Sequence, residues 1–288
     1  IVGLNRRNRE LVMKFNTPAQ IGLANDKIRS KRVMIEKGIS TPELYAELHS
    51  AADANRFTKI LRTIDDGFVL KPARGAQGRG VHIFTHALED GSFLPISDSP
   101  VSPKDFNFLI ASILTGEYSG GRMLDSVLVE RRIHPDHDWV MSGISGPPDL
   151  RVLVIQGSVV MAMLRLPTIQ SGGKSNIHRG AVGVGVDLNT GMTTHAIWRQ
   201  RAITHHPDTG NKISGRPIEE FEECIRLAKA CYPALGLGYF GVDIMLDAHQ
   251  GPTVLEINAR PGLAIQSANR RGLRELISVS NTSQECLS

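Results

Sequence analysis

The order of predicted helices and strands indicates an α+β fold rather than alternating βαβ units. Three observations support this prediction. Helices with a few short strands fill the first half of the chain, hairpins of apolar strands fill the second half, and one long helix, residues 217–235, leads into the last hairpin. With 288 residues, 41% of them hydrophobic and 22% charged, the chain can form one large domain or two modest ones.

Helix signals dominate the first half of the chain. Residues 1–24 read as a short helix followed by a link with Pro and Gly. Asn25 is expected to cap a helix that Gly38 ends, and a second helix covers residues 54–64. A third helix begins at Ser102-Pro103, with apolar residues at helical spacing, and ends near Gly116.

The charge pattern argues against nucleic acid as a partner. The net charge of +4 is mild for this length, and the basic residues are dispersed. The densest basic cluster is formed by Arg6, Arg7 and Arg9, and we interpret it as a solvated helix face.

Neither a membrane nor an oxidising compartment is indicated. The sequence contains no apolar run long enough to cross a bilayer and no signal-peptide core at its start. Cys224, Cys231 and Cys286 lack C-x-x-C spacing and are expected to be buried or tail thiols. We therefore expect a cytoplasmic protein without a membrane partner.

A glycine-rich hairpin follows the strand FVLKP. Gly75, Gly78 and Gly80 stand between this strand and the strand VHIFT, in the order G-x-x-G-x-G, which matches neither the dinucleotide fingerprint nor the P-loop. Such a hairpin can still present backbone N–H groups to phosphate, with Lys71 as an adjacent charge. The alternative is a loose hairpin with an exposed lysine.

The hairpin over residues 239–263 combines apolar strands with oxygen-bearing side chains. If its turn lies between His249 and Gln250, antiparallel pairing places Asp243 opposite Glu256, and Asn258 shares their face. Two facing carboxylates favour a hard cation, and magnesium carrying nucleotide phosphates fits. The alternative is a solvated face of the sheet.

Two further strands turn at Gln156-Gly157 and carry one arginine each. Pairing around this turn makes Arg151 and Arg165 near neighbours and concentrates positive charge, although strand arginines often form surface ion pairs. By contrast, the adjacent His205 and His206 point to opposite faces of a strand, so they do not predict a shared metal.

Three blocks of the sequence carry a family resemblance: DLRVLVIQGSVVMAMLRL, KSNIHRGA, and GVDIML followed by LEINARPGL. They resemble the ATP-grasp family over residues 25–276, in particular the RimK-type α-L-glutamate ligases. The opening NRRNR is similar to that of the α-L-glutamate ligase-like subgroup. The resemblance implies an α+β fold in which two halves clamp ATP.

The resemblance also implies a division of the chain. Residues 1–24 form an extension, 25–129 the smaller half with the glycine-rich hairpin, 130–277 the larger half, and 278–288 a tail. A full N-terminal domain of the kind that precedes these halves in ATP-grasp ligases is not expected. The acceptor would then be held by a partner protein, a second subunit or residues 86–125.

Roles carried over from the resemblance fall into three sets. The nucleotide-binding set is Lys27, Lys71, Gly75, Gly78, Gly80, Glu130, Arg131 and Ile133, with either Asp136 or Asp138 for the ribose. The metal set is Asp243, Glu256 and Asn258. The catalytic and acceptor-side set is Arg151, Arg165, Lys174, Asn176, His178, Arg179 and Arg260.

These residues imply an ATP-dependent ligase that joins a carboxylate to an amine through an acyl phosphate, with glutamate ligation as one form of it. The expected cofactors are ATP and magnesium, two ions, with Mn²⁺ as a substitute. The expected partners are a small-molecule or peptide carboxylate donor and an amine acceptor, and a homo-oligomer is an open alternative. The rival functions are a phosphotransferase acting on a hydroxyl and a non-catalytic ATP-binding subunit.

Overall fold

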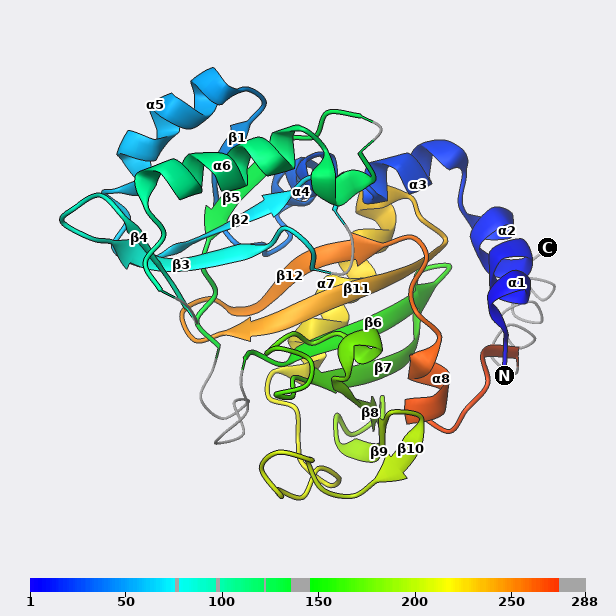
Figure 1. Ribbon diagram of the computed structural model, residues 1–288. Helices are drawn as coiled ribbons and strands as arrows, with labels where there is room; N and C mark the ends of the chain where they lie inside the picture. The colour runs from blue at the N-terminus through cyan, green and yellow to red at the C-terminus, as the bar shows by residue number, and fades with distance from the viewer. Residues whose placement is uncertain (76–77, 97–98, 122, 136–145, 275–288) are drawn as a thin grey trace. The chain divides into compact units, whose positions relative to one another are not determined.

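The computed structural model describes residues 1–75, 78–96, 99–121, 123–135 and 146–274, and Figure 1 traces them. The chain divides into two compact units. The larger unit comprises Ile1–Ala24, Val33–Ser40 and the described residues from Pro135 onward, and the smaller comprises Asn25–Arg32 and Thr41–His134. Each unit combines helices with an antiparallel sheet, so the predicted α+β class is confirmed. Within the described ranges, no helix is both long and apolar enough to cross a membrane.

The smaller unit contains a five-stranded sheet in the order β1-β5-β2-β3-β4. The strands are β1 (Leu44–Leu48), β2 (Phe68–Pro72), β3 (His82–Ala87), β4 (Phe93–Pro95) and β5 (Val127–Arg131). Helices α5 (Ala51–Leu61) and α6 (Pro103–Leu114) pack with the sheet around four phenylalanines, Phe68, Phe84, Phe93 and Phe106, whose ring centroids lie 4.2–6.1 Å apart. A 3-10 turn, Glu117–Ser119, follows α6.

Helix ends in the smaller unit follow local capping chemistry. Ser102 accepts a hydrogen bond from the Asp105 amide (3.2 Å), so the predicted start of α6 is confirmed. Helix α4 (Lys27–Glu36) is capped by Asp26 rather than Asn25, because the Asp26 carboxylate accepts from the Arg29 amide (3.1 Å). Gly38 ends this helix with φ +67°, as predicted. The first part of α4 belongs to the smaller unit and the second part to the larger.

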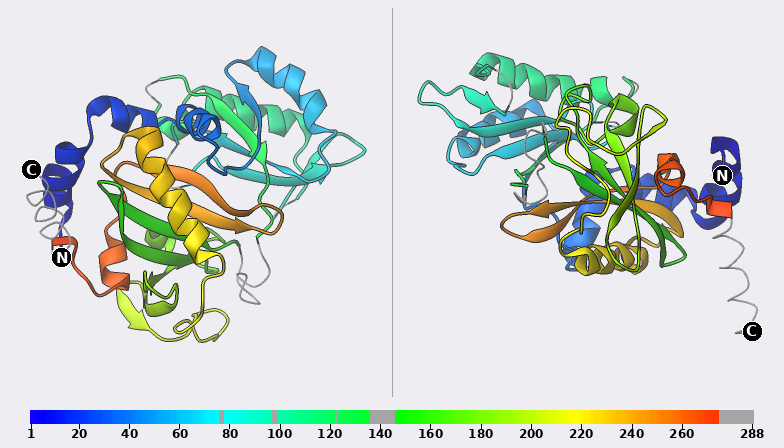
Figure 2. Two further views of the ribbon diagram at one scale, coloured as in Figure 1. Left: turned by 180° about the vertical axis from the view of Figure 1, so that it is seen from behind. Right: turned by 90° about the horizontal axis from the view of Figure 1, so that it is seen from below.

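The larger unit contains a seven-stranded sheet in the order β10-β9-β8-β7-β6-β11-β12. Its strands are β6 (Asp149–Ile155), β7 (Ser158–Leu166), β8 (Val182–Val186), β9 (Thr193–Trp198), β10 (Arg201–Ile203), β11 (Tyr239–Asp247) and β12 (Gly251–Asn258). Helix α7 (Phe221–Leu235), the long helix predicted from the sequence, crosses one face of this sheet (Figure 2).

Alternation along β6 separates the two faces of the larger sheet. Leu150, Val152 and Val154 belong to the core beneath α7, whereas Leu153 and Ile155 belong to a second core on the opposite face. That opposite face is covered at one end by residues 2–15 and by α8 (Ala264–Ala268), whereas residues 18–24 contact α7. The N-terminal helices are α1 (Leu4–Arg7), a π-helix (Asn8–Val12), α2 (Met13–Phe15) and α3 (Pro18–Ala24).

Arg7 corrects one sequence interpretation. We expected Arg6, Arg7 and Arg9 to form a solvated face, but only 7% of Arg7 is exposed. The interpretation is wrong for Arg7 because α1 packs on the sheet together with Val2 and Leu11, which turns this guanidinium inward. Arg6 and Arg9 remain accessible and pair with Glu10.

Candidate functional site

The C-terminal hairpin brings two carboxylates to opposite positions on neighbouring strands. Asp243 on β11 lies across from Glu256 on β12, so the predicted pair is confirmed. The register arises differently from our expectation. Asp247 pairs with Gly251, which centres the turn on His249, and a bulge after Asp243 then shifts the register by one residue. The extra residue in β12 is Leu255.

Asn258 lies beside both carboxylates. Its side-chain nitrogen donates to Asp243 Oδ2 (3.3 Å) and to Glu256 Oε1 (3.1 Å). Asp243 is 3% exposed and Glu256 is half-buried, so one carboxylate is held inside the sheet and the other reaches its surface. Two carboxylates and an amide on one face are oxygen donors of the kind that Mg²⁺ prefers, and this donor set fits the predicted metal site.

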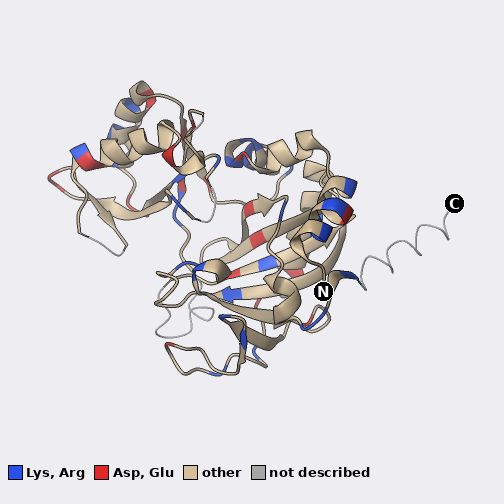
Figure 3. Ribbon diagram, turned by 45° about the vertical axis from the view of Figure 1, so that its right-hand side comes forward, with Lys and Arg blue, Asp and Glu red and all other residues tan. Residues whose placement is uncertain are grey.

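Two arginines on the same face neutralise Asp243. Arg151, opposite Asp243 on β6, donates Nη2 to Asp243 Oδ2 (2.7 Å) and Nε to the other carboxylate oxygen. Arg165 on β7 donates Nη2 to Asp243 Oδ2 (2.8 Å). In Figure 3, arginine and carboxylate residues of this sheet appear as blue and red bands on neighbouring strands. The predicted proximity of the two arginines is confirmed, and their pairing is internal rather than a surface ion pair.

Asp149 completes this cluster and was missed from the sequence. It lies opposite Arg165 and accepts from both Nε and Nη2 of that guanidinium (2.5 Å each). Counting outward from the Gln156-Gly157 turn places Asp149 opposite Leu164, but a register shift between Leu153 and Val154 moves it to Arg165. Asp149 and Arg151 stand two residues apart in a strand of apolar residues, and this spacing was the available signal.

Burial and pairing act in opposite directions on the two aspartates. Burial raises the pKa of both carboxyl groups because it disfavours their charged forms. At Asp243 the two arginines outweigh burial and lower the pKa below its usual value. At Asp149 burial and the negative charge of Asp243 outweigh Arg165, so the pKa is raised. The two arginines therefore favour the charged form of Asp243 more strongly than that of Asp149.

The loop between β7 and β8 carries four of the predicted residues: Lys174, Asn176, His178 and Arg179. Its ends are tied together because Thr168 Oγ1 donates to the Gly180 carbonyl (2.9 Å). Asn176 caps the 3-10 turn Ile177–Arg179 by accepting from the His178 amide (2.9 Å). The Asn176 side chain therefore stabilises this turn, whereas His178 and Arg179 are exposed.

Lys174 and Arg260 occupy different surroundings. Burial lowers the pKa of Lys174, and the charge of Arg179 lowers it further. Arg260 is exposed in the turn that follows β12. His178 lies near the same turn, because a side chain built on Gly262 would have its Cβ 4.0 Å from His178 Nε2. The structure therefore brings His178 close to the segment that carries Arg260.

The smaller unit holds a second charged cluster, centred on Glu130 in β5. Lys31 Nζ donates to Glu130 Oε2 at 2.6 Å, and Lys71 contacts the other carboxylate oxygen. Both lysines and the glutamate are buried. Lys31 was missed from the sequence, although it stands four residues after Lys27 in α4 and so shares a helix face with it.

Burial and charge also shift the pKa values in this cluster. Burial lowers the pKa of Lys31 to about 8, because the charge of Lys71 adds to the effect and Glu130 only partly offsets it. Burial raises the pKa of Glu130, but the two lysines outweigh it and the net shift is downward. One carboxylate thus serves two ammonium groups.

The glycine-rich hairpin joins β2 to β3, which pair antiparallel as predicted. Gly78 and Gly80 adopt φ +66° and +70°, a region that favours glycine. Lys27 Nζ donates to the carbonyl of Gly75 (2.6 Å), so this lysine contacts the base of the hairpin. These contacts bring Lys27 and the first glycine together.

The remaining predicted residues are more dispersed. Arg131 is buried and lies 3.6 Å from Asp66, and Ile133 follows it in a half-buried position. Asp136 and Asp138 lie outside the described residues. His206 is buried and its Nε2 lies 3.0 Å from the Pro167 carbonyl, so we interpret it as a structural residue.

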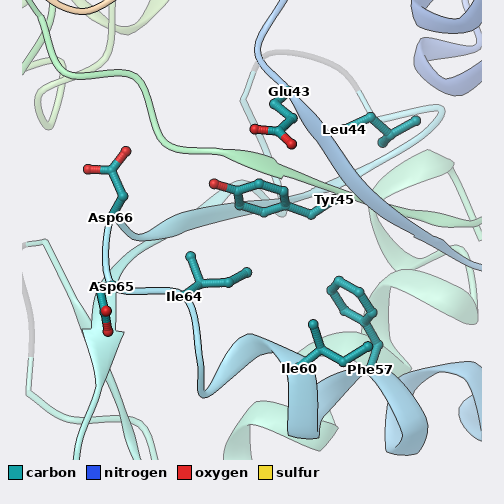
Figure 4. A pocket seen from close by; sticks show the side chains of 8 residues that line it. All are labelled: Glu43, Leu44, Tyr45, Phe57, Ile60, Ile64, Asp65 and Asp66. Atoms are coloured by element: carbon teal, nitrogen blue, oxygen red, sulfur yellow. The ribbon is translucent and has the colours of Figure 1, made fainter.

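A separate pocket lies in the smaller unit between β1 and α5 (Figure 4). Its lining combines apolar side chains with carboxylates. The lining residues are Glu43, Leu44, Tyr45, Phe57, Ile60, Ile64, Asp65 and Asp66. None of the residues predicted for nucleotide, metal or catalysis lines this pocket.

Sequence comparison identifies a matching family. A family model described as sugar-transfer associated ATP-grasp matches residues 6–282. A probable α-L-glutamate ligase of Maridesulfovibrio salexigens is 26% identical over 250 residues, which are 86% of this chain and 60% of the relative. That of Syntrophotalea carbinolica is 27% identical over 270 residues, 92% of this chain and 66% of the relative. The chain thus spans 60–66% of the length of these relatives.

Structural comparison shows the same fold. Biotin carboxylase of Campylobacter jejuni has a TM-score of 0.52 at 16% identity, over 87% of this chain and 43% of that protein. D-alanine–D-alanine ligase of Bacillus anthracis, in a complex with ATP, has a TM-score of 0.50 at 17% identity, over 93% and 64%. The ligase PsnB, with a precursor peptide and AMPPNP, gives 0.51 at 15%, over 94% and 62%. The predicted ATP-grasp fold is confirmed.

Proposed function

Because the chain belongs to the sugar-transfer associated ATP-grasp family, we propose that it is an ATP-dependent carboxylate–amine ligase that forms an amide through an acyl phosphate. The resemblance to proteins named probable α-L-glutamate ligase supports this reaction class and makes glutamate or a glutamyl peptide one candidate substrate. The family's description adds a second candidate class, carboxylates or amines attached to a sugar.

One observation carries the proposal. Asp243, Glu256 and Asn258 lie side by side on the face of the larger sheet on which Arg151 and Arg165 lie. A phosphoryl-transfer enzyme needs oxygen ligands for Mg²⁺ and fixed cations for the phosphoryl oxygens. In this chain Arg151, Arg165 and Asn258 all lie within hydrogen-bond distance of the Asp243 carboxylate, and Asn258 also donates to Glu256.

The proposed chemistry has two steps. In the first, a substrate carboxylate oxygen attacks the γ-phosphorus of ATP, a new O–P bond forms, and the bond to the β-phosphate oxygen breaks to release ADP. In the second, an amine nitrogen attacks the acyl carbon, the C–N bond forms, the C–O bond to phosphate breaks, and the nitrogen loses a proton. Mg²⁺, when bound, neutralises charge on the phosphate oxygens.

The protein's own part is to bind, orient and stabilise charge. We assign Arg151 and Arg165 to the transferred phosphoryl group and the acyl phosphate, because fixed guanidinium groups suit planar and tetrahedral oxyanions. Lys71, with Lys27 beside the glycine-rich hairpin, is assigned to the nucleotide phosphates. Lys174, His178 and Arg260 are assigned to the acceptor side. No nucleophilic side chain takes part.

Trapping of the acyl phosphate tests this proposal. The purified protein is incubated with ATP, Mg²⁺ and hydroxylamine as the amine, together with a panel of carboxylates: L-glutamate, glutamyl peptides, other amino acids and sugar acids. We expect ADP and a hydroxamate in equal amounts for at least one carboxylate. ADP release with a phosphorylated hydroxyl compound would indicate the phosphotransferase instead. ATP binding without ADP release across the panel would contradict the ligase and favour a binding subunit.

A further inference from the structure

The side chain of Arg7 is committed to backbone carbonyls of one turn. Its Nη1 donates to the carbonyl oxygens of Pro261 (2.8 Å) and Arg260 (3.3 Å). Its Nε and Nη2 donate to Asn8 Oδ1 (3.1 and 2.8 Å). Arg7 is buried, and this burial lowers the pKa of its guanidinium. Its three nitrogens are all engaged, either by this turn or by the neighbouring Asn8 side chain.

The turn that Arg7 holds lies against the charged cluster of the larger sheet. Pro261 is buried and packs over Gly241 of β11. A Cβ added to Gly241 would lie 2.9 Å from Pro261 Cβ and 3.0 Å from Arg151 Cδ. The absence of a side chain at Gly241 therefore leaves room for Pro261 and Arg151 to approach the same point of the strand. The turn and the Arg151 side chain thus lie close together over Gly241.

The segment that carries Arg7 is itself fixed on both sides. Gln266 accepts from the Val2 amide (2.8 Å) and donates to the Val2 carbonyl (3.0 Å). Asn16 donates to the carbonyl of Tyr239 (2.7 Å) and accepts from its amide (3.0 Å). Residues 2–16 are thus anchored to the C-terminal part of the larger unit at three places, and Arg7 is the central one.

We propose that Arg7 is a positioning residue for the ligase reaction: its guanidinium fixes residues 259–262 so that Arg260 and Arg151 are held in a defined arrangement. This inference rests on the proposed function. Arg7 has no direct contact with the reacting groups in this role. It acts through the two carbonyl oxygens and through the contact of Pro261 with Gly241.

The test compares three substitutions of equal or smaller size. Arg7→Gln removes the charge and most of the donors, and Arg7→Lys keeps one charge with a single donor group. Arg9→Gln is the matched control, because Arg9 lies two residues away with a side chain that is 79% exposed and pairs with Glu10. Each variant is assayed with ATP, hydroxylamine and the carboxylate that gives the fastest wild-type turnover.

We expect Arg7→Gln to lower kcat roughly 10- to 100-fold with the KM for ATP within about twofold, since displacement of a positioned group by about 1 Å costs up to this much. Arg7→Lys should recover part of the loss, and Arg9→Gln should match the wild type. Equal losses in kcat and ATP affinity, or full activity of Arg7→Gln, would overturn the proposal.

Hydrogen exchange separates this inference from the proposed function. The amide of Gln266 donates to the Leu263 carbonyl (3.0 Å) where the turn ends. In Arg7→Gln this amide should exchange at least about tenfold faster, while those of β11 keep their wild-type protection. Unchanged exchange at Gln266 would refute the anchoring by Arg7, whether or not turnover is seen. Absence of turnover in the wild type would instead refute the ligase reaction.

Discussion

The two units each bury a charged cluster on a sheet, and the clusters differ in balance. In the smaller unit, Glu130 faces two lysines, Lys31 and Lys71. In the larger unit, two carboxylates face two arginines, which form multiple hydrogen bonds with fixed geometry. Lysine is a single charged point that can lose its proton when buried, whereas arginine stays charged and holds carboxylates in a plane.

This difference indicates which ligand each cluster favours. Two lysines on one glutamate leave a surplus positive charge in a buried place, which a phosphate can neutralise. In the larger unit the four buried charges cancel, and Glu256 beside them adds a negative charge that favours a cation.

Replacement of Glu256 should remove the negative charge that favours a cation beside the cluster of the larger unit. We expect Glu256→Ala to lower turnover roughly 10³-fold, because several kcal/mol of charge stabilisation in the transition state depend on the metal ligands. ADP release measures this effect, and circular dichroism checks that the variant folds. Glu222→Ala, an exposed glutamate of α7, is the control. Full activity in Glu256→Ala would remove the metal assignment.

Loss of Glu130 should leave two buried ammonium groups without a counter-charge. We expect Glu130→Gln to destabilise the smaller unit by about 3–5 kcal/mol, whereas Lys31→Met should cost less than about 1 kcal/mol because Lys71 keeps its partner. Urea unfolding followed by circular dichroism gives the totals, and hydrogen exchange in β5 locates the change. Glu43→Gln, at an exposed position near β1, serves as the control. Similar costs for the two variants would contradict the two-to-one arrangement.

Loss of Arg165 should separate chemistry from nucleotide binding. We expect Arg165→Ala to lower kcat about 10²-fold and to leave the KM for ATP within about threefold, because a phosphoryl contact made in the transition state acts mainly on kcat. Since Asp149 would lose its partner, the substitution is also made together with Asp149→Asn. Arg201→Ala, on the exposed edge strand β10, is the control. An equal loss in both parameters would exclude a catalytic role.

The buried cluster of the smaller unit should make the stability of the protein depend on pH through Lys31. The pKa of Lys31 in the folded chain, about 8, lies below its ordinary value of 10.5. Between these values the unfolded chain binds the proton that the folded chain has released, so stability rises with pH in this window. Relative to Lys31→Met, the wild type should gain about 1–3 kcal/mol from pH 8 to 10.5. Urea titrations at four pH values measure this, and a flat or falling difference would contradict it.

Much of the fold could be predicted from local sequence signals. Ser102-Pro103, Gly38 and the alternation in the hairpins act over a few residues, and the corresponding elements are confirmed. Lys31 was missed because its partner Glu130 stands 99 residues away in the sequence. Asp149 was missed because only the shifted register places it opposite Arg165. A bulge shifts such a register by one residue, and composition gives no sign of it.

The interpretation of Arg7 failed for a related reason. A basic cluster on a short helix is usually solvated, and nothing local marks one arginine of three as different. Its partners are backbone carbonyls more than 250 residues away. The roles in nucleotide, metal and acceptor binding are predicted from residue types and positions, and the proposed substitutions test them by activity.

Because Leu255 is an extra residue in β12, we expect the hairpin to tolerate a one-residue deletion at this position but not at others. Deleting Leu255 would convert the strand to regular pairing with Glu256 still opposite Asp243, so relatives with a one-residue gap there can retain both acids in place. The same gap inside β11, between Asp243 and Asp247, would instead turn Asp243 toward the helix-covered core. Alignments of related chains should therefore be judged at this hairpin by where a gap falls rather than by how many residues it removes.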